Sequence, residues 1–153
     1  MAVHLLVKCL LFCFVILTML KIATLNVQGL RNQEKQQFLF SFIHEQKFDI
    51  IALQEVHFSS ADVKRWQKNW EGLSFWRPGG TNRAGVAFLF KKNLDCKAEI
   101  IDQDFNGSIL CAQVTYENFT FQLLNLYGPG QETRQSCNSF FDEVHHTLKS
   151  YHW

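Results

Sequence analysis

Three polar side chains follow directly after apolar stretches, and their chemical types suit the binding of a metal ion and a phosphate. These residues are Asn26 after the stretch 21–25, Glu55 after the run 50–53 and Gln54, and Tyr127 after 123–126. Magnesium prefers one or two carboxylates together with water and substrate phosphate. An amide and a phenol can orient a phosphate by hydrogen bonding. The three residue types therefore suit metal-assisted phosphate chemistry, provided that the fold brings them together.

Glu55 taken alone has two explanations. The run 50–53 is apolar without alternation, which predicts a strand buried on both faces, and Gln54 and Glu55 stand at its C-terminal edge. A glutamate at a strand end usually emerges into solvent, because a carboxylate is costly to bury without a partner. Open α/β sheets, however, hold their ligands at this edge. Polar groups at the ends of two further strands favour a ligand site.

Residues 33–46 predict a helix that connects the first two strands. Phe38, Leu39, Phe42 and Ile43 recur at helical spacing, and charged residues lie on the other face. A helical crossover of this kind makes the two strands parallel neighbours. We expect Phe38 and Phe42 to be core residues without a functional role.

A second helix is expected to begin at Ser59 or Ser60, which can cap it, and to run to about residue 70 with Asp62 in its first turn. Its basic residues are Lys64, Arg65 and Lys68. They form either a solvated face or a face that contacts phosphate beside the site. His57 is interpreted as a packing or local hydrogen-bonding residue.

The segment 73–90 predicts two strands separated by a loop. Residues 73–76 form a short strand, and the glycine-rich turn 77–83 is flanked by Arg77 and Arg83. The loop is either an ordinary surface loop or a contact to a DNA backbone. Residues 85–90 predict a central strand.

The second half of the chain predicts three closely spaced strands and a final helix. The strands span about 97–101, 109–116 and 120–126, with turns at 106–107 and 117–118. A helix is expected from 133 to about 151. Its apolar stripe comprises Phe140, Phe141, Val144 and Leu148. His145 and His146 are interpreted as ordinary helix residues rather than ligands.

The composition predicts a folded chain without a strong electrostatic preference. With 153 residues, 47% of them hydrophobic and 15 of them phenylalanine, the chain is one domain or part of one. The net charge of +1 gives no independent support to nucleic-acid binding, although a local patch can suffice. The five cysteines include no CxxC pair, so we expect free thiols in a reducing compartment.

Residues 1–20 differ from the rest of the chain, 21–153, which we expect to form the domain. Residues 5–20 are almost wholly apolar but shorter than the ~20 residues that span a bilayer. They are a signal anchor, an uncleaved interfacial segment, or translated upstream sequence with the natural start at Met19. We favour the last. Contact with a membrane would be made only through residues 5–20. Two glycosylation sequons, at Asn106 and Asn118, matter only in a secreted protein.

The motifs around the three polar residues resemble the endonuclease/exonuclease/phosphatase superfamily, which includes exonuclease III, abasic-site endonucleases and deoxyribonuclease I. They most closely resemble the endonuclease domain of LINE-type non-LTR retrotransposons. The matching segments are LNVQGL at 25–30, DIIALQEVHF at 49–58 and NLYGP at 125–129. The resemblance covers about residues 20–150. It implies an α/β fold: the N-terminal part of a four-layer α/β/β/α sandwich with two mixed sheets, truncated.

The resemblance also implies a function for each residue of the site. Glu55 would bind the catalytic divalent ion, magnesium or manganese. Asn26 would hydrogen-bond within the phosphate and metal site, and Tyr127 would contact the scissile phosphate. The implied reaction is hydrolysis of a DNA phosphodiester, leaving a nick that primes reverse transcription. DNA is the implied partner, and the location is intracellular, in the nucleus for a retroelement endonuclease.

The sequence departs from the family pattern in its missing second half. We find no Gly-Asp-x-Asn segment, no further site aspartate and no Ser-Asp-His, so this chain contains no general base. The remaining acids lie in expected turns or helices and do not substitute: Asp95, Asp102, Asp104, Asp142 and Glu143. We therefore expect little or no activity from this chain alone. The alternatives are a non-enzymatic retroelement relic or partial gene model, and a secreted or membrane-anchored phosphodiesterase.

Overall fold

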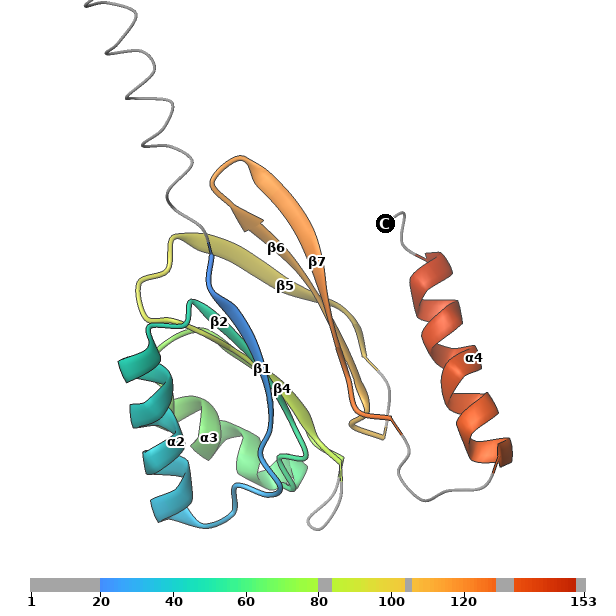
Figure 1. Cartoon of the computed structure of the whole chain (residues 1–153), viewed down its shortest axis with the longest axis horizontal. Coiled ribbons are helices and arrows are strands. Elements are labelled where there is room, and N and C mark those ends of the chain that lie inside the picture. The colour runs from blue at the N-terminus through green and yellow to red at the C-terminus, as the bar shows by residue number, and fades with distance from the viewer. Residues whose placement is uncertain (1–19, 80–83, 104–105, 129–133, 151–153) are drawn as a thin grey trace, which may run out of the picture.

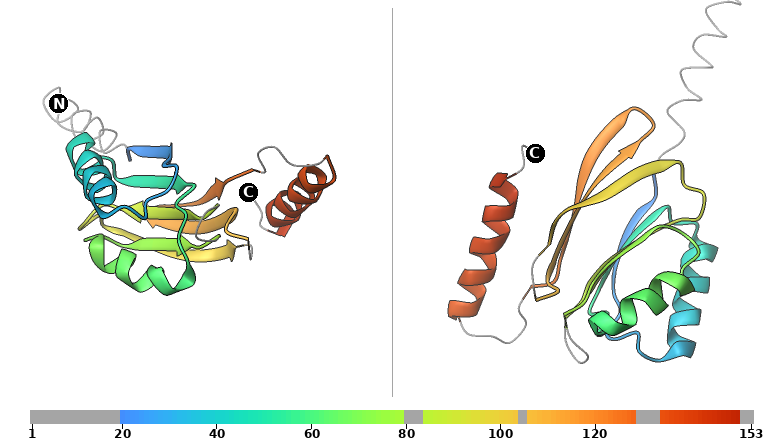
Figure 2. Two further views of the ribbon diagram at one scale, coloured as in Figure 1. Left: turned by 90° about the horizontal axis from the view of Figure 1, so that it is seen from below. Right: turned by 180° about the vertical axis from the view of Figure 1, so that it is seen from behind.

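The computed structural model describes residues 20–79, 84–103, 106–128 and 134–150. Two β-sheets lie face to face, with two helices outside the first sheet and one helix beyond the second (Figures 1 and 2). This arrangement confirms the predicted α/β sandwich of four layers. The N-terminal segment 1–19, Arg83 and Asp104 lie outside the described residues. The expectations for them therefore stay predictions.

The first sheet has the strand order β1-β2-β4-β3. These strands are β1 (Ile22–Asn26), β2 (Ile50–Gln54), β4 (Val86–Phe90) and β3 (Ser74–Arg77). β1 and β2 are parallel, whereas β4 is antiparallel to both β2 and β3, so the sheet is mixed. All residues of β4 are buried, which confirms its predicted central position.

Helix α2 (Gln33–Gln46) makes the predicted crossover between the parallel strands β1 and β2. The side chain of Asn32 caps its first turn by accepting a hydrogen bond from the Lys35 amide at 2.9 Å. Lys47, in the left-handed conformation, ends the helix.

The prediction that Phe38 and Phe42 belong to the core was wrong. Phe38 is 75% exposed and Phe42 is 37% exposed. The face of α2 that packs on the first sheet comprises Gln36, Leu39, Phe40 and Ile43. The apolar residues of this helix, all within 38–43, cover about half of its circumference, so their spacing alone did not identify the face that meets the sheet.

The segment after β2 forms a short 3-10 turn, η1 (Ser60–Asp62), followed by α3 (Val63–Asn69). The Asp62 carboxylate accepts hydrogen bonds from the Ser59 amide at 3.2 Å and from the Ser59 hydroxyl at 2.7 Å. Both of these hydrogen bonds run from Ser59 to Asp62, and the Asp62 amide donates back to the Ser59 carbonyl at 3.0 Å, so Ser59 is the residue that begins the turn, as predicted. Trp66 of α3 is buried and packs against Phe58 and Trp76.

The second sheet has the order β5-β6-β7. Its strands are β5 (Cys96–Gln103), β6 (Ile109–Tyr116) and β7 (Phe119–Leu126). All three described strands are antiparallel to their neighbours, with a register shift in β5 between Ile100 and Asp102. Apolar residues of its inner face, including Leu110 and Val114, pack against Phe88 and Phe90 of the first sheet to form the core between the sheets.

Helix α4 (Arg134–Ser150) lies beyond the second sheet (Figure 1). Its predicted apolar stripe is only partly buried: Val144 is 8% exposed, whereas Phe141 is 64% and Leu148 is 38% exposed. His145 and His146 are exposed. Within the described residues, part of the apolar face of α4 is therefore not covered by other side chains.

The described cysteines are free thiols, as predicted: Cys96, Cys111 and Cys137. Burial raises the pKa of the Cys111 thiol to about 11, so this group is neutral at physiological pH. Among the described residues, no helix is both long enough and apolar enough to cross a membrane.

Candidate active site

The ends of β1 and β2 bring Asn26 and Glu55 together. Because the strands are parallel, Asn26 lies beside Gln54, the residue before Glu55. The Asn26 side-chain amide donates a hydrogen bond to Glu55 Oε1 at 2.8 Å. Its Oδ1 accepts one from the Gln28 amide at 3.1 Å. Asn26 is thereby oriented on both sides, with its amide nitrogen directed at the carboxylate.

The turn after β1 is adapted to this contact. Gln28 and Gly29 both have positive φ, of 47° and 84°. The Gly29 amide donates to the Glu55 carbonyl at 2.6 Å. A Cβ at residue 29 would lie 3.1 Å from His57 Nδ1, so the turn requires glycine both for its backbone conformation and for the approach of His57.

The backbone after β2 also leaves ordinary strand geometry. Glu55 and His57 have φ values of 54° and 57°, which are uncommon for residues other than glycine. The intervening Val56 amide donates to the Gly85 carbonyl at 3.0 Å, and the His57 amide donates to the Ala84 carbonyl at 3.1 Å. Such conformations persist where the surroundings hold them, and they concentrate at functional sites.

The Glu55 carboxylate is stabilised in its charged form. The hydrogen bond from Asn26 is the main reason that its pKa lies below the ordinary value, and partial desolvation opposes this effect. A hydrogen bond from Tyr127 and the nearby His57 lower the pKa further. His57 Nε2 lies 3.7 Å from Glu55 Oε2. Glu55 is therefore ionised at neutral pH, and the structure brings all three predicted residues together.

Two polar residues that hydrogen-bond to Gln54, namely Asn125 and Thr24, were missed in the sequence. Asn125 is buried on β7, and its Oδ1 accepts a hydrogen bond from Gln54 Nε2 at 2.6 Å. Gln54 also donates to Thr24 Oγ1 at 2.9 Å. The available signal was the position of Asn125 two residues before Tyr127, because side chains two apart on a strand share a face.

A lysine assigned only to the polar face of α2 also reaches the turn. Lys35 Nζ donates to the carbonyls of Val27 at 2.7 Å and Gln28 at 3.2 Å. The predicted basic face of α3 is exposed, and one of its members, Arg65, pairs with Asp62 at 2.8 Å. Lys35 thus stabilises the carbonyls of the turn that follows Asn26.

A cavity of about 640 Å³ lies between β1 and β7, and two of the three candidate residues, Asn26 and Tyr127, line it. Its polar lining comprises Thr24, Asn26, Gln54, Asn125 and Tyr127. The rest of its wall is largely apolar, with Ile22, Phe88 and Leu123. The polar groups and the apolar wall together form a concave site at the edge of the sandwich.

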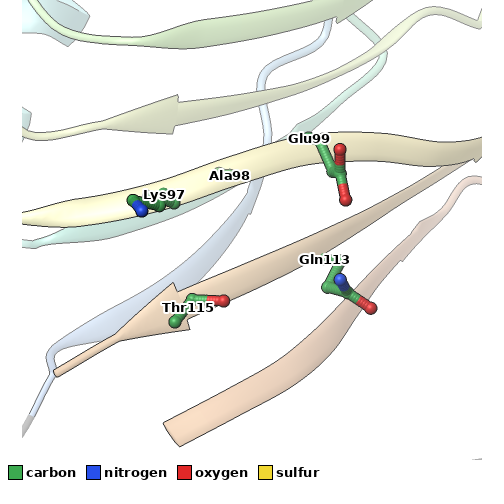
Figure 3. A pocket seen from close by; sticks show the side chains of 5 residues that line it. All are labelled: Lys97, Ala98, Glu99, Gln113 and Thr115. Atoms are coloured by element: carbon green, nitrogen blue, oxygen red, sulfur yellow. The ribbon is translucent and has the colours of Figure 1, made fainter. Parts of the chain in front are cut away.

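A second hollow, of about 220 Å³, lies on the second sheet and is separate from these residues (Figure 3). Lys97, Glu99, Gln113 and Thr115 line it, together with Ala98. These polar side chains belong to β5 and β6, and Figure 3 shows them on the strand surface. No residue predicted for the site is among them.

The donor set at Glu55 fits a magnesium or manganese ion held by few protein ligands. Its side chain is 22% exposed and ionised, and magnesium keeps several waters and binds proteins through one or two carboxylates. The described part of the chain contains no group of three or more histidine, cysteine, aspartate or glutamate side chains arranged for a metal ion. If such an ion binds here, Glu55 would hold it without a cage of several His, Cys, Asp or Glu ligands from the described residues.

The chain belongs to the endonuclease/exonuclease/phosphatase family, whose sequence model matches residues 23–147. This match covers more than half of the chain and includes Asn26, Glu55 and Tyr127. The fold and the site described above are consistent with this membership.

A transposon protein and several solved structures are similar to the chain. The "Transposon TX1 uncharacterized 149 kDa protein" of Xenopus laevis is 27% identical over 110 residues, which are 72% of this chain and 8% of that protein. An AP endonuclease from Leishmania major superimposes with a TM-score of 0.62 at 19% identity, covering 84% of this chain and 47% of the other. The endonuclease domain of TRAS1, a telomere-specific non-LTR retrotransposon, gives a TM-score of 0.58 at 14% identity, covering 85% and 54%.

A humanized TDP2 from D. rerio gives a TM-score of 0.59 at 22% identity, covering 85% of this chain and 59% of that structure. At these identities the solved structures establish the shared fold. The chain spans about half the length of these structures and a small fraction of the transposon protein.

Proposed function

We propose that the chain contributes to a divalent-metal-dependent hydrolase that nicks DNA, of the kind used by non-LTR retrotransposons. The observation that carries this proposal is the convergence of Asn26, Glu55 and Tyr127 from three strands. The transposon protein and the retrotransposon endonuclease domain among the similar proteins support the element type. A nuclear location follows from this proposal, because the DNA target of such an element is chromosomal.

Each residue has a physical role in the proposed reaction. Glu55, ionised at neutral pH, would hold magnesium or manganese, and the bound ion would neutralise charge on the phosphoryl oxygens. Asn26 holds the carboxylate in place through its hydrogen bond to Oε1, and His57 Nε2 lies 3.7 Å from Oε2. Tyr127 lies beside the same carboxylate and lines the cavity, where its hydroxyl can donate to a phosphate oxygen.

Hydrolysis also requires a base that activates the attacking water. Among the described residues, no three or more His, Cys, Asp or Glu side chains form a group that could hold a metal ion. We therefore propose that the 153-residue chain by itself has little or no nicking activity. The alternative is a non-enzymatic relic, and the experiments below separate the two.

Metal binding is the direct test that does not need activity. Manganese is paramagnetic, so its binding broadens the NMR signals of nearby amides. We expect broadening around Asn26, Glu55 and Tyr127 that Glu55→Gln abolishes. The matched control is Glu71→Gln, an exposed carboxylate paired with Lys92 at 2.9 Å, which should leave the broadening unchanged. Equal broadening in the Glu55→Gln protein would reject Glu55 as the ligand.

Plasmid nicking with magnesium tests the reaction itself. The assay compares this chain and a version extended through the downstream reading frame, each with and without Glu55→Gln. Nicking only by the extended version, and its loss with Glu55→Gln, would support the nuclease. Nicking by the 153-residue chain would overturn the prediction that it is inactive alone. No nicking in any version would leave the relic alternative.

A further inference from the structure

Asn125 connects the two sheets through its side chain. It lies on β7 of the second sheet and is only 2% exposed. Its Nδ2 donates to the Leu53 carbonyl of β2 at 3.0 Å and to the Ala87 carbonyl of β4 at 2.9 Å. Leu53 and Ala87 are paired residues of the first sheet, so one amide group bridges two adjacent strands.

The side-chain oxygen of Asn125 extends this hydrogen-bond network to β1. Asn125 Oδ1 accepts a hydrogen bond from Gln54 Nε2 at 2.6 Å, and Gln54 reaches Thr24 of β1 at 2.9 Å. Both hydrogens of the Asn125 amide and its oxygen are therefore used. A buried polar network that is fully satisfied restricts the arrangement of the elements it joins, since its bonds are directional.

This network lies immediately beneath the candidate site. Asn125 is two residues before Tyr127, and Leu53 is two residues before Glu55. Asn125 and Tyr127 both line the cavity of about 640 Å³. The inter-sheet hydrogen bonds thus join the strand end that carries Tyr127 to the strand end that carries Glu55.

We propose that Asn125 is a positioning residue that sets the placement of Tyr127 against Glu55. An apolar residue would fill the same space, but apolar contacts are not directional and would allow β7 to shift along the first sheet. A displacement of about 1 Å between reacting groups is enough to impair a reaction strongly. The chemical importance of this placement rests on the proposed function, whereas the placement itself does not.

The test uses fluorine NMR on protein labelled with 3-fluorotyrosine. The chain has three tyrosines, and Tyr127→Phe identifies the signal of Tyr127. In the otherwise unchanged protein, Glu55→Gln should shift this signal, because Tyr127 lies close enough to the Glu55 carboxyl to lower its pKa. With Asn125→Leu present, we expect the response to Glu55→Gln to fall several-fold, while the other tyrosine signals keep their positions.

The matched control is Asn118→Leu, the same chemical change at an exposed position in the β6–β7 turn, which should preserve the full response. A folded Asn125→Leu protein with an undiminished response would overturn the proposal. Near-ultraviolet circular dichroism establishes folding. If Asn125→Leu does not fold, Gln54→Leu removes one of the three hydrogen bonds of Asn125. A reduced response then supports the proposal, and an unchanged response overturns it.

No metal, substrate or activity enters this measurement. A chain that fails to bind manganese or to nick DNA would therefore refute the proposed function without affecting the fluorine result. Conversely, an unchanged fluorine response would refute the role of Asn125 and leave the function of Glu55 open to its own tests.

Discussion

The contact between Asn26 and Glu55 shows how a neutral residue controls the charge of an acid. The Asn26 amide donates to Glu55 Oε1 at 2.8 Å, and this hydrogen bond favours the ionised form. Tyr127 and His57 act in the same direction, whereas partial burial acts against them. The proposed metal ligand is thus kept charged by neighbouring hydrogen-bond donors and a nearby histidine.

We predict that Asn26→Ala raises the pKa of Glu55 toward its ordinary value of 4.5, because it removes the largest cause of the shift. A carbon-13 NMR titration of the carboxyl group measures this pKa. Since the folded-state pKa is depressed, the stabilisation from ionised Glu55 is present above pH 4.5 and is lost as the pH falls through the lowered value. Asn118→Ala, at an exposed turn position, is the control.

Urea unfolding gives the second readout of this prediction. Asn26→Ala should lower the free energy of unfolding at pH 7, because it weakens the stabilisation from ionised Glu55. This difference from the unchanged protein should become smaller at pH values below the pKa of Glu55. An unchanged Glu55 titration in the Asn26→Ala protein would show that the hydrogen bond does not control the carboxyl group.

Helix α2 illustrates how an element with apolar residues on several sides selects its buried face. Leu39, Phe40 and Ile43 meet the first sheet, together with the buried polar Gln36. Asn69 of α3 donates to Gln36 Oε1 at 2.9 Å, which partly compensates the burial of this amide. Contact with both the sheet and α3 therefore determines the orientation of the helix.

Two phenylalanines of α2 provide a matched test of this orientation. Phe40 is 8% exposed and Phe38 is 75% exposed. We predict that Phe40→Ala lowers the free energy of unfolding by about 3–5 kcal/mol through lost burial and a new cavity. Phe38→Ala should change it by no more than about 0.5 kcal/mol, as surface substitutions usually do. Urea unfolding measures both, and equal losses would contradict the orientation of α2.

At the scale of the whole molecule, each described sheet has an edge strand that pairs on one side only. Within the described residues, β1 pairs only with β2, and β7 pairs only with β6. Ile22 of β1 is 48% exposed and Phe119 of β7 is 72% exposed. An exposed strand edge with apolar side chains can pair with another chain.

We predict that the exposed edge of β1 promotes self-association of the chain and that Ile22→Lys reduces this self-association. A lysine on an edge strand opposes pairing through its charge and its desolvation cost. Light scattering at increasing protein concentration should show a several-fold smaller associated fraction. The control is Phe38→Lys, which adds the same charge at an exposed position on a helix. An equal reduction by both variants would indicate a general charge effect rather than pairing at β1.

Much of the local structure could be predicted from the sequence because it depends on short-range patterns. The span 33–46 of α2 and the span 109–116 of β6 match their predicted bounds. The cap at Ser59 and the parallel crossover from β1 to β2 also followed from local residue types and from chain topology. The positions of Asn26, Glu55 and Tyr127 at strand ends were visible for the same reason.

The tertiary structure decided what depends on contacts between distant segments. The sequence spacing did not distinguish Phe38 from Phe40, because only the sheet and α3 select the buried face of α2. It did not identify Asn125 either, since an asparagine on a strand reveals its role only when the facing sheet supplies Leu53, Ala87 and Gln54 as partners. The sequence by itself thus determined the elements and the chemical types at their ends. The packing of the two sheets determined which of those groups meet, because hydrogen bonds and burial require atoms to be close in space.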